Sequence, residues 1–265
     1  MHKLTREVRF SVNPFLAESC EGFNSYVSKP CGEGLALYFG LWVELTGGVD
    51  DDTGFVVNVT DIDKAVREFV VPVFAEKIKG DFSKQEHIGL GEVFELLKQA
   101  RSILKDKFQP AGLNRLWLQL NPFRKITIGS EETQMFYFSE KFEFAAMHTL
   151  WNDKFSEQRN FETFGKCANP AGHGHNYIVE VTVKRSAEGR AGWTGGFEKI
   201  IEDEFISVVD HKNLNEEVAH FEKKNPTVEN IAAFGWEQLA GKFDSAELSS
   251  VTVWETDRTY CTYCG

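Results

Sequence analysis

The 265 residues are enough for one large domain or two of ordinary size, and a hydrophobic content of 42% with 23 Phe is sufficient for well-packed cores. A net charge of −11 disfavours binding to nucleic acid or to an anionic membrane, so any polyphosphate ligand would need a local basic pocket. No apolar run approaches the roughly 18 residues of a membrane span, and the N-terminus MHKLTREVRF lacks the apolar segment of a secretory signal. We therefore expect a cytoplasmic protein whose five cysteines are free thiols.

The first half of the chain predicts a strand, two helices and a second strand. The strand at Phe39–Leu45 leads through a Gly/Asp-rich loop into a helix over roughly Ile62–Phe74. A second helix is expected at Val93–Leu104, and a strand at Arg115–Leu120. The apolar stripe of the first helix consists of Ile62, Val66 and Phe69.

The second half repeats this order. It predicts a strand at His175–Val183, helices at Phe197–Val209 and Val228–Leu239, and a strand at Ser250–Glu255. The stripe of its first helix consists of Ile201, Phe205 and Val208. We therefore predict an α+β protein of two tandem units, residues 1–130 and 131–265, joined at the polar stretch 129–134. Each unit would be an antiparallel four-stranded sheet with two helices on one face; coincidental α+β patterning is the alternative.

Three histidines predict a metal site. His173 and His175 are two apart on a strand, so both imidazoles point to the same face. The alternation of Phe142, Phe144, Ala146 and His148 places the third imidazole at the end of a neighbouring strand. Three His with one open coordination position are typical of a catalytic zinc site. The alternative is an accidental pair of surface histidines.

Further polar groups are candidates for chemistry. Cys167 lies six residues before His173, and a turn at Asn-Pro-Ala-Gly would return its thiol toward the metal. A nearby cation and histidine would lower its pKa; a buried, inert Cys is the alternative. Asp210 can orient His211 as a proton shuttle, or the two can be an ordinary pair at a helix end.

The C-terminal segment holds two more candidates. Glu255, at the end of the last strand, could bind a cyclic amidine in bidentate fashion, or be an ordinary surface carboxylate. Cys261 and Cys264 form a C-x-x-C pair, but on a strand they face opposite sides, so we interpret it as structural or incidental. Pro226-Thr227 places a hydroxyl at the expected N-cap of the helix Val228–Leu239.

From Phe138 to the C-terminus the chain resembles the 6-pyruvoyltetrahydropterin synthase family. The resemblance rests on the segments FEFAAMH, LWNDKFSEQRNFETFGKCANPAGHGHNY, VVDHKNLN, NPTVEN and WETD, in this order and spacing. It implies the tunnelling fold, in which small sheets of neighbouring subunits join into an oligomeric barrel. It also implies a lyase that acts on 7,8-dihydroneopterin triphosphate and eliminates triphosphate.

The resemblance also assigns roles. Zn²⁺ would be held by His148, His173 and His175 and would acidify the substrate's side chain. Cys167 would be the base, and Asp210 with His211 the proton relay. The pterin would be bound by Glu255, with Thr227 and Glu229 near the pocket. No nicotinamide cofactor is implied, and no G-x-G-x-x-G occurs. Basic residues for the triphosphate remain open, with Lys154, Arg159 and Lys166 as neighbours in sequence.

Two alternatives to this activity remain, one related enzyme and one non-catalytic protein. A 6-carboxytetrahydropterin synthase of the queuosine pathway would use the same substrate and metal but release acetaldehyde, and the spacing from Cys167 to His173 favours the pyruvoyl type. A non-catalytic pterin- or zinc-binding module is the other alternative.

The chain also departs from the family pattern. Gly196 stands where the family has an acidic residue, and we expect it to act as the helix N-cap. In the first unit Leu37 and Phe39 align with the zinc histidines, and Val71-Pro72 with the Asp-His pair. We therefore expect a degenerate first unit without zinc ligands, and a homo-oligomer such as a trimer of two-unit chains.

Overall fold

The structure is a computed structural model that describes residues 1–15, 35–129, 134–187 and 192–265. The chain divides into two compact units, Met1–Phe138 with Ser186–Glu188, and Ser139–Arg185 with Gly189–Gly265. The expected boundary between residues 130 and 131 lies outside the described residues, as do Cys20 and Cys31. Both units combine helices with antiparallel strands, as the sequence predicts.

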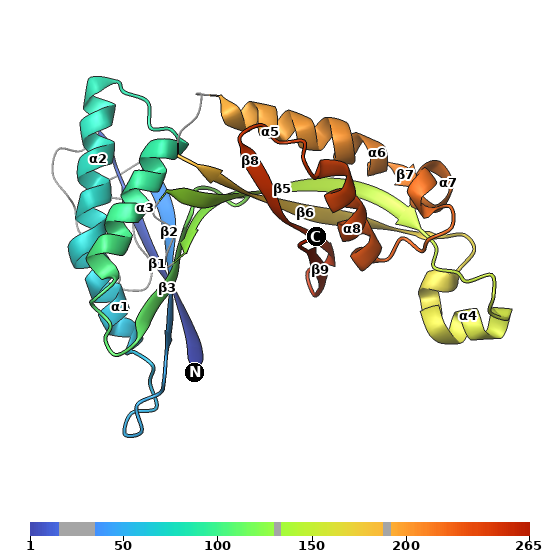
Figure 1. Ribbon diagram of the computed structural model, residues 1–265, viewed down its shortest axis with the longest axis horizontal. Helices are drawn as coiled ribbons and strands as arrows, with labels where there is room; N and C mark the ends of the chain where they lie inside the picture. Colours follow the sequence, from blue (N-terminus) through green and yellow to red (C-terminus); the bar gives the residue numbers. More distant parts are fainter. Residues whose placement is uncertain (16–34, 130–133, 188–191) are drawn as a thin grey trace. The chain divides into compact units, whose positions relative to one another are not determined.

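The first unit has four antiparallel strands with helices on one face. The strands lie side by side in the order β1 (His2–Val12), β2 (Leu37–Gly47), β3 (Gly112–Gln119) and β4 (Arg124–Gly129). The helical segments are α1 (Val59–Ala65), the π-helical turn η1 (Val66–Val70), α2 (Val71–Lys84) and α3 (Leu90–Leu104). They cover one face of the strands (Figure 1) and bury an apolar core beneath them.

The second unit has the same order of elements. Its strands run in the order β5 (Met135–His148), β6 (His173–Ser186), β8 (Ala246–Thr256) and β9 (Thr259–Tyr263), with the short β7 (Lys212–Asn213) parallel to β5. The start of β5, up to Phe138, and the last residue of β6 are counted with the first unit. Its covering helices are α5 (Trp193–Ile201), the π-helical turn η3 (Glu202–Ile206), α6 (Ser207–Val209) and α8 (Val228–Leu239). The connections hold α4 (Glu157–Phe164), the 3-10 helix η2 (Gly165–Ala168), α7 (Leu214–Glu217) and the 3-10 helix η4 (Ala219–Phe221).

A π-helical turn interrupts the first long helix of each unit and corrects the predicted apolar stripes. Because a π-turn inserts one extra residue per turn, the buried face moves one position along the chain. Val70 is buried where Phe69 was expected, and Phe69 is 43% exposed. In the second unit Val209 is buried, whereas Val208 is only partly covered. The same irregularity thus falls at the same place in both units.

One expected helix start is wrong, and one helix is longer than predicted. The N-cap of α5 is Gly192, whose φ of 83° lies in the left-handed region, so Gly196 lies inside the helix rather than at its start. In the first unit the helix predicted over roughly Ile62–Phe74 extends to Lys84, and Val71-Pro72 lies at the start of α2. Pro72 directly follows the π-helical turn, where the Val71 amide bonds the Val66 carbonyl and the regular i to i−4 hydrogen bonding is already interrupted.

An aromatic cluster occupies the first unit near the ends of β1 and β2. The ring of Phe10 lies 5.3 Å from Phe39 and 5.4 Å from Phe74, centroid to centroid. Phe10 and Phe74 are fully buried. At Phe39, which we align with His175 from the sequence, the first unit therefore has apolar packing. In the described part of the chain, no helix is both long and apolar enough to cross a bilayer.

Candidate metal centre

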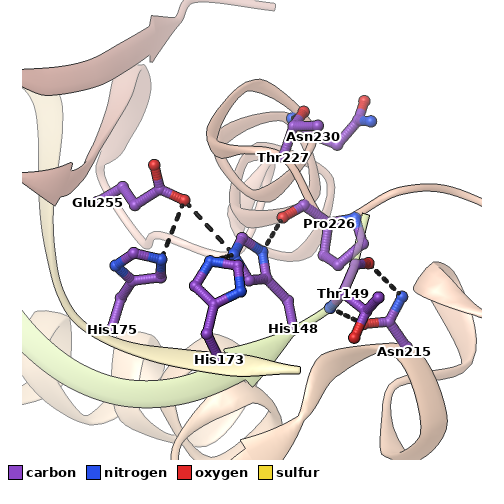
Figure 2. Close-up of polar contacts among 9 residues, drawn as sticks. All are labelled: His148, Thr149, His173, His175, Asn215, Pro226, Thr227, Asn230 and Glu255. Carbon is purple, nitrogen blue, oxygen red and sulfur yellow. Dashed lines mark hydrogen bonds and ion pairs between the residues drawn. The ribbon is translucent and has the colours of Figure 1, made fainter. Parts of the chain in front are cut away.

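Three imidazoles from two neighbouring strands converge at one end of the second unit's sheet. His148 is the last residue of β5, and His173 and His175 open β6. One ring nitrogen from each lies within 4.8 Å of the other two, and the Nε2 atoms of His148 and His173 are 3.0 Å apart. Within the described ranges, this is the only group of three or more His, Cys, Asp or Glu side chains close enough to share an ion. Figure 2 shows the three rings facing a common point.

The orientation of His148 is fixed from outside the strand. Its Nδ1 donates to the carbonyl oxygen of Pro226 at 2.8 Å, which leaves the Nε2 lone pair directed at the other two rings (Figure 2). A second hydrogen bond of this kind is the usual device that orients a metal-bound histidine. Pro226 is held by the turn before α8, where Thr227 is the predicted N-cap and accepts from the Asn230 amide.

The donor set fits a metal ion. The Nε2 of His175 and the Nδ1 of His173 are buried and have no hydrogen-bond partner among the described residues. A buried polar atom without a partner is costly, and a shared cation would satisfy the Nε2 of His175. On His173 the nitrogen that faces His148 is Nε2, so a shared ion would leave its Nδ1 without a partner. Ligand nitrogens of tetrahedral Zn²⁺ are roughly 3.3 Å apart for Zn–N bonds of about 2.05 Å. The Nε2 atoms of His148 and His173, 3.0 Å apart, are close to this spacing.

The protonation of the cluster also suits a cation. Burial lowers the pKa of His148, although the Pro226 carbonyl opposes this effect. Burial, and then the neighbouring His175, lower the pKa of His173. Both rings therefore remain neutral near pH 7, which is the form that binds metals.

The turn before β6 delivers the first of these ligands. The side chain of Asn169 accepts from the Ala171 amide at 3.0 Å, and its carbonyl accepts from Gly172 at 2.9 Å, so the Asn-Pro-Ala-Gly turn forms as predicted. Gly172 has a φ of +70°, and a Cβ there would lie 2.7 Å from the terminal methyl of Met147. Glycine is favoured at this position by the positive φ, while the Met147 methyl could move aside.

Cys167 lies in η2 and is not part of the histidine cluster. Its carbonyl accepts from the Leu150 amide at 2.8 Å, which ties η2 to the segment after His148. Burial, and then the negative charge of Glu255, raise the pKa of Cys167. The protein groups alone therefore raise this pKa, mainly through burial, and the expected lowering by a bound cation stays a prediction.

Asp210 and His211 form a hydrogen-bonded pair. The imidazole Nδ1 donates to the Asp210 carboxylate at 2.7 Å, while the other carboxylate oxygen accepts from the Ala145 amide at 2.8 Å. The Ala145 hydrogen bond is the main reason that the pKa of Asp210 is lowered. The side chain of His211 is 82% exposed and its φ is 55°, so the ring points outward from this unit.

Glu255 lies beside the imidazoles. Its Oε1 is 3.6 Å from the Nε2 atoms of both His148 and His175 (Figure 2). Glu229, in contrast, lies in the first turn of α8. The pKa of Cys261 on β9 is raised mainly by the burial of its thiol and secondly by the charge of Glu229. The structure therefore places Glu255, and not Glu229, next to the three histidines.

Sequence reasoning missed three residues of this site. The Pro226 carbonyl orients His148, and Asn215 binds both the amide and the carbonyl of Thr149, at 2.8 and 3.0 Å. Tyr177 is fully buried, stacks on Phe144 at 4.8 Å, and has a hydroxyl without a hydrogen-bond partner among the described residues. All three lie in segments that carry the family resemblance, but only Tyr177 also has a periodicity signal, since it continues the i, i+2 alternation that begins at His173.

Known proteins match the half of the chain that contains this site. Residues 137–265 match the family model of 6-pyruvoyl tetrahydropterin synthase. The 6-pyruvoyl tetrahydrobiopterin synthase of Homo sapiens is 36% identical over 130 residues, which is 48% of this chain and 90% of the human protein. That of Drosophila melanogaster is 36% identical over 126 residues, 46% of this chain and 75% of the fly protein.

A solved structure matches the same share of the chain. The 6-pyruvoyl tetrahydropterin synthase of Caenorhabditis elegans is 32% identical, covers 51% of this chain and 99% of its own, and aligns with a TM-score of 0.46. The identity to the human protein over 90% of its length confirms the resemblance noted in the sequence. Through its second half, this chain belongs to the 6-pyruvoyl tetrahydropterin synthase family.

Proposed function

We propose that the protein is a zinc-dependent lyase that converts 7,8-dihydroneopterin triphosphate to a 6-substituted tetrahydropterin of the 6-pyruvoyl type, with loss of triphosphate. The observation that carries this proposal is the convergence of three imidazoles, one of which, His175, has a buried Nε2 without a hydrogen-bond partner among the described residues. Membership of a family whose curated members are named synthases of this type supplies the reaction.

His148, His173 and His175 would hold the ion. When bound, Zn²⁺ supplies Lewis acidity, which makes the C–H and O–H groups of a hydroxylated side chain easier to deprotonate. The protein's contribution is a set of ligands held in place before the ion arrives, with His148 oriented by Pro226.

Two groups outside the histidine cluster would transfer protons. Cys167 would act as the base after ionisation, and His211 would move a second proton. Because His211 donates its Nδ1 proton to Asp210, its Nε2 is left as the atom that accepts or releases a proton. The lowered pKa of Asp210 keeps this carboxylate charged while the imidazole cycles.

Glu255 would bind the pterin ring. A carboxylate has two acceptor oxygens, which match the adjacent N–H and NH₂ of a cyclic amidine. Its present position near His148 and His175 puts this anchor next to the metal ligands. Thr227 and Glu229 would support the pocket from the first turn of α8, Thr227 mainly through its capping bond.

The first unit would be a degenerate copy, residues 1–130, beside the catalytic unit, residues 131–265. Two features support a duplication: both units have the same order of elements, and both have a π-helical turn at the same place. The Phe10–Phe39–Phe74 cluster replaces the imidazoles. We extend this proposal to a tunnelling-fold barrel made of several chains, such as a trimer; a monomeric mass in solution would exclude it.

The test compares four proteins for bound zinc and for turnover of 7,8-dihydroneopterin triphosphate. Cys167→Ala should retain zinc and lose turnover, and the double variant His173→Ala/His175→Ala should lose both. His87→Ala is the matched control, since His87 is an exposed histidine of the first unit. Zinc that stays bound to the double variant at wild-type stoichiometry would contradict the proposed site.

A further inference from the structure

The four residues after His148 form an unusual set of contacts. Residues 149–152, here called the hub segment, have neither helical nor strand structure. Each of their main-chain amides nevertheless donates a hydrogen bond to a different part of the second unit. The acceptors, in order, are the Asn215 side chain at 2.8 Å, the Cys167 carbonyl at 2.8 Å, the Asn225 side chain at 2.9 Å and the Asn160 side chain at 2.8 Å.

Three of these acceptors lead directly to functional groups of the proposed site. The Cys167 carbonyl belongs to the proposed base itself. Asn225 immediately precedes Pro226, whose carbonyl orients His148, and its own carbonyl accepts from Asn230 at 2.8 Å. Asn215 ends the stretch that begins at Asp210. The hub segment therefore connects the end of β5, which carries His148, with Cys167 and with the stretch that holds Asp210 and His211.

The stretch from Asp210 to Asn215 lies along the end of β5. At one end, Asp210 accepts from the Ala145 amide at 2.8 Å, and the His211 amide donates to the Ala145 carbonyl at 2.6 Å. In the middle, β7 pairs with β5 in parallel. At the other end, the Asn215 amide group binds both the N–H and the C=O of Thr149 (Figure 2).

Asn215 thus closes the far end of this contact. A side chain that binds both main-chain groups of one residue imitates a neighbouring strand and fixes the register of the two segments. Resting on the proposed function, we infer that Asn215 is a positioning residue that aligns the Asp210–His211 pair with the end of β5 that carries His148. It touches neither substrate nor metal in this role.

A purely structural role predicts a different result from a positioning role. If Asn215 only stabilised the fold, replacing it with alanine would change kcat and the His211 tautomer no more than replacing any other asparagine whose side chain binds a main-chain amide. Asn58 is such a residue: in the first unit its side chain accepts from the Thr60 amide at 3.1 Å and caps α1. Asn58→Ala is therefore the matched control for Asn215→Ala.

The experiment measures kcat and KM with zinc-loaded full-length protein, and the ¹⁵N shifts of the His211 imidazole, which report whether Nδ1 donates to Asp210. We expect Asn215→Ala to lower kcat about 10- to 100-fold with a smaller change in KM, as displacement of a catalytic group by about 1 Å does. The His211 signals should lose the single-tautomer pattern. Asn58→Ala should change neither, and Asn215→Asp, which keeps the acceptor for the Thr149 amide, should recover part of kcat.

The outcomes separate this inference from the proposed function. A kcat of Asn215→Ala within twofold of wild type, or an unchanged His211 tautomer, would overturn the positioning role. If the wild type itself does not turn over, the proposed function fails, and the His211 tautomer in the Asn215 variants still decides whether Asn215 positions the pair.

Discussion

Tyr177→Phe is expected to stabilise the protein prepared without metal. The ring of Tyr177 is fully buried and stacks on Phe144 with an interplanar angle of 11°, and phenylalanine would keep this packing. Only the hydroxyl would be removed. Burial, and then the charges of Glu255 and Cys167, raise the pKa of this phenol, so it stays protonated and brings one unpaired O–H donor into the interior.

The magnitude follows from the cost of an unsatisfied buried donor, which is about 1–3 kcal/mol. Allowing for local relaxation, we expect the free energy of unfolding to rise by about 1 kcal/mol, or the midpoint by roughly 2–4 °C. Urea unfolding followed by tryptophan fluorescence measures the change. Tyr260→Phe is the control, since Tyr260 is 60% exposed and its variant should stay within about 0.5 kcal/mol of wild type. A loss of 1 kcal/mol or more in Tyr177→Phe would mean that the hydroxyl is hydrogen-bonded in solution, and would refute the reasoning.

Two other predictions concern the same unit. Burial lowers the pKa of His148, so as pH falls below about 6.5 the unfolded chain takes up a proton that the folded chain does not. The free energy of unfolding should therefore decrease as pH falls, by up to about 1.4 kcal/mol per pH unit. Urea unfolding from pH 7.5 to 5.0 tests this, and a slope equal to that of His148→Gln would contradict it. Thr227→Ala removes the α8 cap and should cost about 1 kcal/mol; unchanged unfolding in urea would show that the cap contributes nothing.

Periodicity in the sequence was sufficient to predict the strands and helices that carry the site. The i, i+2 spacing of His173 and His175 fixed their common face, and the alternation ending at His148 identified the neighbouring strand. The predicted cap at Thr227 is also confirmed. These features could be predicted because each depends on residues that are close in sequence.

The π-helical turns could not be predicted in this way. A π-turn changes the period within one turn, and the apolar residues on either side fit both registers. Phe69 and Val70 are both apolar, as are Val208 and Val209, so composition does not decide which is buried. The correct choice follows only from packing against the strands below.

The polar contacts around the metal centre were missed for a different reason. Asn215 and Pro226 act on residues that are 66 and 78 positions away in sequence. Pro226 acts through its carbonyl, an atom that every residue has. Long-range contacts to main-chain atoms leave no pattern in a single sequence.

The most direct test of the proposed function is the product formed anaerobically from 7,8-dihydroneopterin triphosphate by the zinc-loaded protein, identified by mass spectrometry. Our account predicts a 6-pyruvoyl tetrahydropterin, one triphosphate released per turnover and no acetaldehyde. A 6-carboxy product with acetaldehyde would contradict the assigned reaction while leaving the site in place. Binding of the substrate without any product would contradict the claim that the protein is an enzyme of this type.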